Sequence, residues 1–144
     1  MRIVCGWFLL LSVILLCAAG EGQANENMIP RNQAERIVND YFGMLKDGYT
    51  LGVLDLLTGP MLRNNENLLR NNPGYVNFLR ERYNNSSFVI AKYMSNDIGK
   101  AAVDVVIHLK TNEEIKIRFT LVAESDRLKI YAEEELARVE GNSE

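Results

Sequence analysis

The chain has 144 residues, of which 47% are hydrophobic and 24% are charged, and its formal net charge is -3. This length allows one folded domain, and this composition excludes an intrinsically disordered chain. The mild negative charge argues against nucleic acid as a partner, because nucleic-acid binding usually needs a clustered basic face.

Residues 1–24 have the layout of a secretory signal peptide. A short positive start, Met1-Arg2, precedes an almost unbroken apolar run over residues 3–17, and small and polar residues follow. Cleavage fits equally well after Gly20 or after Ala24. The apolar run is shorter than the roughly 20 residues that span a bilayer, so an uncleaved anchor is the less favoured alternative. We therefore expect a secreted or periplasmic protein.

Both cysteines, Cys5 and Cys17, and the only tryptophan lie in this first segment. The mature domain is therefore expected to have no disulfide, no thiol nucleophile and no thiolate metal site. Cys17 closes the apolar region, where bacterial lipoproteins carry their lipid, so a membrane-anchored lipoprotein is the alternative localisation. Leu16 is larger than the small residue that usually precedes a lipidated cysteine.

Residues 25–31 predict a flexible leader, and the folded domain is expected over residues 32–135. Asn32 begins the first helix as an N-cap, with Glu35 placed to complete a capping box. Gly48 ends this helix. The apolar residues in between recur at helical spacing and predict one buried face: Ala34, Ile37, Val38, Tyr41, Phe42 and Leu45.

Three shorter helices are predicted next. Thr50 caps the first, which is apolar on nearly all sides and ends at Gly59-Pro60. The second covers residues 61–70, and Asn72-Pro73 starts the third, which continues to about Asn84. The asparagines here serve caps and turns. Asn84-Asn85-Ser86-Ser87 contains two overlapping glycosylation acceptors, which matter only in a eukaryotic cell.

From Ser87 onward the apolar residues alternate with a period of two, which is typical of strands with one buried face. Four strands are predicted, with turns at residues 95–99, 111–114 and 125–126, and residues 136–144 form an acidic tail. In the first strand Phe88, Ile90 and Met94 alternate with Val89, Ala91 and Tyr93. The inward set of the other three is Val103, Val105, Ile107, Leu109, Ile115, Ile117, Phe119, Leu121, Leu128 and Ile130. The outward set is Asp104, His108, Lys110, Lys116, Arg118, Thr120, Lys129, Tyr131 and Glu133.

Helices followed by a meander predict an α+β fold, with N-terminal helices packed on the concave face of a curved four-stranded antiparallel sheet. Over residues 33–133 this order resembles the nuclear-transport-factor-2-like (NTF2-like) superfamily, also called the cystatin-like cone. The similar stretches are Lys46-Asp47-Gly48, Ala101-Ala102-Val103-Asp104-Val105, Phe119-Thr120-Leu121 and Leu128-Lys129-Ile130. Many exported members close with Trp-Lys-Ile, and here Leu128 stands in place of the tryptophan.

The superfamily includes isomerases, dehydratases, polyketide cyclases and non-catalytic binding domains, and its enzymes place Asp, His or Tyr inside the cone. The inward strand set of this chain has no acid or base, so no catalytic residue, metal site or cofactor is predicted. His108, the only histidine, is expected on the surface beside a carboxylate. Tyr41, Tyr75, Tyr83 and Tyr93 could line a pocket mouth, although core or rim packing is the simpler interpretation.

We therefore expect a non-catalytic binding or accessory domain whose apolar cone interior takes an apolar small molecule, or which contacts an envelope protein. The expected ligand contacts are Tyr41, Phe42, Leu54, Tyr93, Val105, Ile107 and Phe119. The alternative is an isomerase or dehydratase in which helix residues such as Tyr41 or Asp55 reach the pocket. A possible homodimer through the sheet would use an outer apolar strip of Val106, Val122 and Tyr131.

Overall fold

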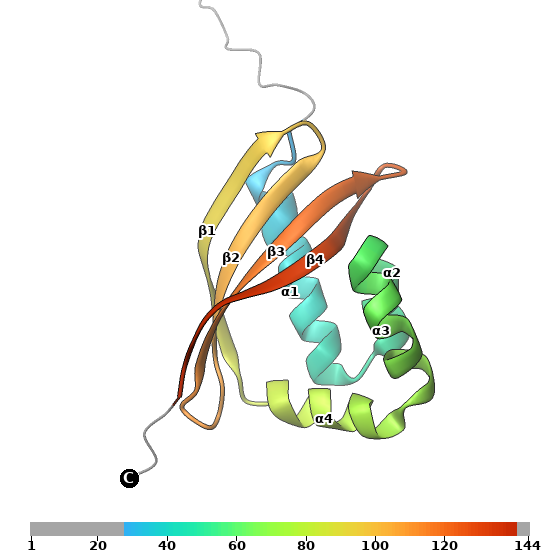
Figure 1. The fold of residues 1–144 in the computed structure, drawn as a ribbon, viewed down its shortest axis with the longest axis vertical. Coiled ribbons are helices and arrows are strands. Elements are labelled where there is room, and N and C mark those ends of the chain that lie inside the picture. The colour runs from blue at the N-terminus through green and yellow to red at the C-terminus, as the bar shows by residue number, and fades with distance from the viewer. Residues whose placement is uncertain (1–27, 141–144) are drawn as a thin grey trace, which may run out of the picture.

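A computed structural model of the chain describes residues 28–140, without the side chains of residues 96 and 97. The predicted signal peptide lies outside the described residues. Four helices precede a four-stranded antiparallel sheet, which confirms the predicted α+β architecture (Figure 1). The elements are α1 (Arg31–Asp47), α2 (Thr50–Leu56), α3 (Gly59–Asn71), α4 (Pro73–Tyr83), β1 (Ser87–Asp97), β2 (Lys100–His108), β3 (Glu114–Glu124) and β4 (Arg127–Val139).

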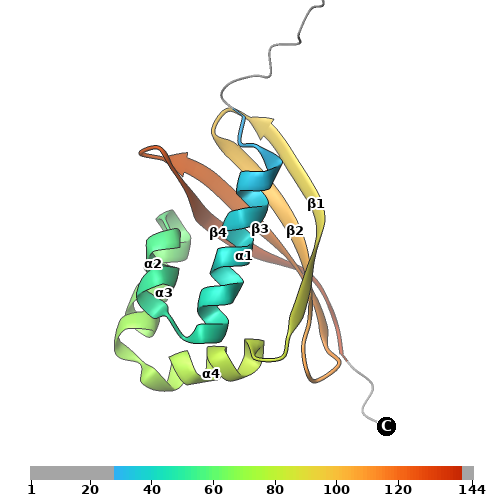
Figure 2. The same ribbon diagram turned by 180° about the vertical axis from the view of Figure 1, so that it is seen from behind.

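The strands lie in the order β1-β2-β3-β4, so each strand pairs with its neighbour in the chain and β1 and β4 form the edges. The sheet is curved, and α1 lies along its concave face (Figures 1 and 2). α3 packs beside β4, and α4 crosses the end of α1. Within residues 28–140, no helix combines the length and the apolar character needed to cross a membrane.

The first helix starts differently from the prediction but ends as predicted. Pro30, in extended conformation, is the N-cap residue, so Asn32 lies inside α1 and the predicted capping box does not form. Glu35 instead forms an ion pair with Arg31 at 2.6 Å. Gly48 adopts the left-handed conformation with φ 70°, which glycine tolerates without a Cβ clash, and terminates the helix. The six predicted stripe residues are all buried.

The starts of the other helices follow the prediction in part. Thr50 lies in the first turn of α2 with Tyr49 as the N-cap residue, and α3 begins at Gly59 rather than at residue 61. The predicted start of α4 is confirmed, because the Asn72 side-chain oxygen accepts a hydrogen bond of 3.0 Å from the backbone N–H of Tyr75.

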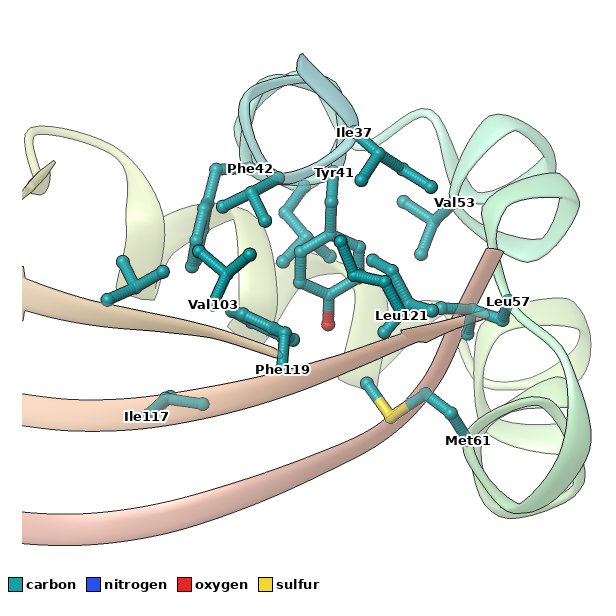
Figure 3. Packing of buried hydrophobic residues seen from close by; sticks show 14 of the residues in the cluster. Ile37, Tyr41, Phe42, Val53, Leu57, Met61, Val103, Ile117, Phe119 and Leu121 are labelled. Carbon is teal, nitrogen blue, oxygen red and sulfur yellow. The ribbon is translucent and has the colours of Figure 1, made fainter. Parts of the chain in front are cut away.

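Aromatic side chains form the centre of the core between α1 and the sheet (Figure 3). The Phe42 ring lies 4.5 Å from Phe88 and 5.8 Å from Phe119, and Phe119 packs edge-on against Tyr41 at 5.5 Å, measured between ring centroids. Phe119 is 0% exposed. Burial of each such apolar side chain contributes about 1.5–3 kcal/mol to folding, so these contacts hold α1 on the concave face.

Each edge strand has two register shifts, and one extra residue in each changes which of the following side chains face inward. In β4, Leu121 of β3 pairs with Ile130 and Thr120 pairs with Ala132, so Tyr131 is an extra residue. Glu133 then pairs with Phe119 on the concave side. In β1, Ala91 is extra, and Tyr93 pairs with Val103. The predicted outward position of Glu133 is therefore wrong, because the bulge at Tyr131 shifts the alternation by one residue. The bulge at Ala91 likewise interrupts the alternation predicted for the first strand.

The last strand continues past the predicted end of the domain at residue 135. β4 runs to Val139, and residues 137–139 pair with β3 rather than belonging to a tail. Arg138 holds this end through ion pairs with Glu135 at 2.6 Å and with Glu113. Residues 141–144 lie outside the described residues.

The convex face has a row of alternating charges across all four strands: Lys92, Asp104, Arg118 and Glu134. Arg118 donates two hydrogen bonds to Asp104, at 2.7 and 3.0 Å. Asp104 is only 2% exposed, and long outer-face side chains rather than the core cover it. Nearby, His108 Nδ1 lies 3.3 Å from Glu114, which confirms the predicted surface histidine beside a carboxylate.

Candidate functional site

A cavity of about 250 Å³ lies where the four helices meet β4. Its lining residues come from every helix and from one strand: Tyr41, Leu45, Val53, Leu57, Met61, Asn65, Leu69, Tyr75, Leu79, Tyr83 and Glu133. Glu133 is the only lining residue from the sheet, and its inward position follows from the extra residue at Tyr131. The cavity is therefore a helix-lined space closed on one side by a carboxylate.

Tyr41 projects from the middle of α1 toward the sheet and α3, with its hydroxyl on the side of Met61 (Figure 3). The residue is only 8% exposed. In the described part of the chain, every side-chain nitrogen or oxygen that is fully enclosed has a hydrogen-bond partner. The Tyr41 hydroxyl has no such partner, so it is not fully enclosed. The hydroxyl is therefore accessible from the cavity.

Glu133 stands at the mouth of the cavity, where its side chain reaches solvent on one side and packed protein on the other. Burial raises the pKa of this carboxyl above its ordinary value of 4.5, and the charge of Glu135 raises it further. Among residues 28–140, no lysine, arginine or histidine forms an ion pair with it. Glu133 is thus a partly desolvated carboxylate without a positive partner.

Two further tyrosines enter the cavity from α4. Burial raises the pKa of Tyr83 to about 12 and also raises that of Tyr75, with the charge of Glu133 as the second cause in both. The same two causes hold the pKa of Tyr41 well above 10.0. All three phenols therefore keep their protons at neutral pH, and they serve as hydrogen-bond donors and aromatic rings rather than as proton acceptors.

Asn65 adds an acceptor to the lining. Its side-chain nitrogen donates to the backbone oxygen of Met61 at 2.8 Å, one turn earlier in α3. The amide oxygen remains as the group that it can offer to the cavity. Together with Glu133 and the tyrosines, this makes the lining partly polar. The prediction of a cone interior that is apolar throughout is therefore wrong.

The seven predicted ligand contacts separate into one cavity residue and six others. Tyr41 lines the cavity, whereas Phe42, Leu54, Val105, Ile107 and Phe119 are buried in the core. Tyr93 lies at the edge of the core, and its hydroxyl donates to the backbone oxygen of Ile29. Ligand contact by these residues stays a prediction, and Tyr41 is the one that faces the cavity.

Two other residues that the sequence suggested lie away from the cavity. Asp55, suggested for the enzyme alternative, is exposed beside Arg127 and Lys129. Tyr131, suggested for the outer strip, packs over Gly59, and the charged row separates it from Val106. The homodimer stays a prediction.

Sequence patterns pointed to Tyr75 and Tyr83 as possible rim residues, but not to Asn65 or Glu133. No alternation rule could have found Glu133, because its face depends on the bulge. In the part of the chain that the structure describes, no group of three or more His, Cys, Asp or Glu residues is placed to hold a metal ion.

No protein-family model matches this chain, and no curated protein matches it. Its structure is similar to that of an NTF2-like protein of unknown function from Shewanella baltica OS155, with a TM-score of 0.50 and 7% identity over 71% of this chain and 88% of the other. An NTF2-like protein of unknown function from Cytophaga hutchinsonii ATCC 33406 is more distant, with a TM-score of 0.37 and 14% identity over 67% and 87% of the two chains. The Shewanella likeness shows that the fold is NTF2-like, as the sequence predicted.

Proposed function

We propose that this chain is a non-catalytic binding domain that holds a small, partly polar molecule in the helix-lined cavity. The observation that carries this proposal is that the Tyr41 hydroxyl and the Glu133 carboxylate face the same cavity, and neither has a protein partner in the described residues. Both groups are open to water in the free protein, so a ligand that enters the cavity can take over their hydrogen bonds.

The size of the cavity limits the ligand. Its volume of about 250 Å³ exceeds that of a ~150 Å³ cavity that accommodates benzene, and it falls just below the ~300–1,000 Å³ range of most ligand pockets. A ligand of the size of a substituted single ring or a short branched chain fits this space. Because the lining is partly polar, we propose a partly polar ligand in place of the apolar one that the sequence suggested.

The pKa values of the lining residues favour binding over catalysis. A proton-transfer catalyst works best with a pKa near the working pH, whereas burial moves the three phenols away from neutrality. Glu133 is the one lining group whose pKa moves toward neutrality. An acid–base enzyme that relies on Glu133 is therefore the second candidate, and turnover that is abolished in Glu133→Gln would support it.

Native mass spectrometry of the protein purified from its own cell tests the binding proposal, combined with a ligand-observed NMR screen of small fragments. Asn65→Trp, on the half-buried rim of α3, should fill the cavity and abolish binding. Asn67→Trp is the matched control on the exposed side of the same helix and should bind normally. Equal binding by both variants, or no retained molecule and no fragment hit, would overturn the proposal.

We also propose that the domain acts outside the cytoplasm, on the basis of the predicted signal peptide over residues 1–24. The mass of the protein from its own cell distinguishes cleavage after Gly20 or Ala24 from a lipidated Cys17. Retention of residues 1–24 without lipid would contradict export. An envelope protein as partner remains the second binding mode, and co-purification from the native envelope tests it.

A further inference from the structure

The charge of the cavity lining is unbalanced. Glu133 is its only ionisable carboxylate, and none of the eleven lining residues is a lysine, arginine or histidine. Arg82 interacts with the hydroxyl of its neighbour Tyr83 and lowers the pKa of that phenol, but Arg82 does not line the cavity. Its guanidinium lies 3.9 Å from Glu113 and 5.9 Å from the centre of the Phe78 ring. The lining itself therefore has a negative group and no positive group among the described residues.

The remaining lining is suited to a positively charged group that is not strongly hydrated. Tyr41, Tyr75 and Tyr83 contribute three aromatic rings, whose faces attract cations through their quadrupole. Met61 adds a polarisable thioether, and Asn65 adds an acceptor oxygen. The other lining residues are leucines and one valine, which accommodate methyl and methylene groups. Rings, a carboxylate and aliphatic carbon are the groups that recognise alkylammonium ions.

Other ligand classes fit less well. An anion would lie beside the Glu133 carboxylate and be repelled by it. A neutral molecule would gain no attraction to that carboxylate beyond its apolar fit. A cation instead neutralises Glu133 and uses the rings around it.

Resting on the proposed binding function, we propose that the ligand of this cavity is a small organic cation, whose alkylammonium group lies among Tyr41, Tyr75 and Tyr83 and against the Glu133 carboxylate.

A set of probes of equal shape and different charge tests this inference in titration calorimetry of the purified protein. The probes are choline, its neutral carbon analogue 3,3-dimethylbutan-1-ol, and the anion 3,3-dimethylbutanoate. Choline should bind about tenfold or more tightly than the neutral analogue, because cation–π contacts and coulombic attraction to the carboxylate add to the same apolar fit. The anion should not bind measurably.

Variants locate the preference in the cavity. Glu133→Gln should bring the affinity for choline down to that for the neutral analogue, whereas Glu134→Gln, one residue further on the convex face, should leave it unchanged. Tyr75→Phe keeps the ring and should retain most of the preference, whereas Tyr75→Leu should reduce it several-fold. Circular dichroism establishes that each variant is folded before its affinity is compared.

The outcomes separate this inference from the proposed function. If the neutral analogue binds as tightly as choline and Asn65→Trp abolishes both, the cavity is a binding site and the cationic preference is wrong. If none of the three probes binds while other fragments do so in a manner sensitive to Asn65→Trp, the cationic inference is again overturned and binding stands. If no small molecule binds at all, both proposals fail together.

Discussion

Glu133 faces the cavity without a positive partner among the described residues. It faces Phe119 across the sheet and Tyr41, Tyr75 and Tyr83 across the cavity, and Glu135 lies near it on its own strand. None of these groups is positive. The raised pKa of Glu133 means that the folded chain holds a proton on this carboxyl more readily than the unfolded chain does.

The first prediction concerns the pH dependence that follows. Because the folded pKa is raised, the stabilising contribution of Glu133 is complete below its ordinary pKa of 4.5 and is lost as the pH rises through the folded value. Glu133→Gln cannot ionise and keeps that contribution. Its melting temperature at pH 7 should therefore lie slightly above that of the unsubstituted chain, because solvent screens this exposed carboxylate, and the difference should vanish below pH 4.5 in calorimetric scans.

Glu134→Gln is the control, since this neighbour lies on the convex face beside Arg118. It should show no such rise. A Glu133→Gln variant that melts below the unsubstituted chain at pH 7 would contradict the interpretation of Glu133 as an unpartnered carboxylate.

Asp104, in contrast to Glu133, is a carboxylate with a positive hydrogen-bond partner, Arg118. The hydrogen bonds from Arg118 lower the pKa of Asp104 below its ordinary value of 3.8. A lowered folded pKa contributes stability that is present above 3.8 and is lost as the pH falls through the folded value. Asp104→Asn should therefore destabilise the domain at pH 7 by about 1–3 kcal/mol in urea denaturation, because it removes a covered charge-assisted pair.

The Asp104→Asn difference should shrink in acid, below pH 3.8. Asp40→Asn, an exposed change on α1, provides the comparison and should leave the free energy of unfolding nearly unchanged. If the two variants had equal stability, the Asp104–Arg118 pair would contribute nothing to the fold.

At the level of elements, the junction of α2, α3 and β4 depends on one glycine. The backbone N–H of Thr58 donates to the Ile130 oxygen at 3.0 Å, which brings Gly59 beneath the ring of the bulge residue Tyr131. Gly59 has φ 54°, and an added Cβ would lie 2.5 Å from a Tyr131 ring carbon. Both the conformation and the close approach require glycine here.

Gly59→Ala should therefore destabilise the domain by about 1–3 kcal/mol in chemical denaturation, since it combines a strained backbone with a steric overlap. A double-mutant cycle separates the two causes. Tyr131→Ala removes the ring, so in its background Gly59→Ala should cost less and retain only the backbone part. An equal cost in both backgrounds would show that the ring does not contact this glycine.

The strands also show which inward and outward faces could be predicted from the sequence. Period-two alternation placed β2 and β3 correctly, and Val103, Val105, Ile117 and Phe119 are all buried as predicted. β2 and β3 pair with each other without a register shift, so inward and outward side chains alternate along the whole of both strands. β1 and β4 each have two register shifts, and nothing in the local sequence marks Ala91 or Tyr131 as an extra residue. The position of a bulge is decided by contacts elsewhere in the fold, such as that of Leu57 with Ile130.

For the molecule as a whole, the candidate site was less predictable than the fold for a related reason. The fold follows from helix stripes and strand alternation, which are local in sequence. The cavity collects residues from four helices and from β4, so its lining depends on how α3 is placed beside β4 and α4 across the end of α1 (Figure 1). Tyr41 could be proposed because it lies on a predicted stripe, whereas Glu133 needed the packed structure.

Packing is also uneven across the molecule, and this predicts uneven local stability. α1 buries six residues, whereas none of the residues of α4 is buried. Regions with few buried contacts open with lower free energy than the core does. Amide hydrogen exchange should therefore be faster in α4 than in α1 or β2, as measured by mass spectrometry on the free protein.

Because Tyr75, Leu79 and Tyr83 line the cavity, occupancy of the cavity should slow exchange in α4. Exchange in β2, which contributes no lining residue, should stay unchanged and serves as the internal reference. Protection of α4 equal to that of β2 in the free protein would contradict the prediction that α4 is less stable than α1 and β2.

The bulge at Tyr131 also bears on how open the edge of the sheet is to pairing with another strand. A regular edge strand offers unpaired backbone groups that can pair with a strand of another molecule and start aggregation. In β4 the bulge interrupts this row, the Leu57–Thr58 segment already pairs at Ile130, and Glu133, Glu134 and Glu135 follow. The opposite edge, β1, is interrupted at Ala91. The irregularity that turns Glu133 toward the cavity thus also protects an open sheet against growth by strand addition.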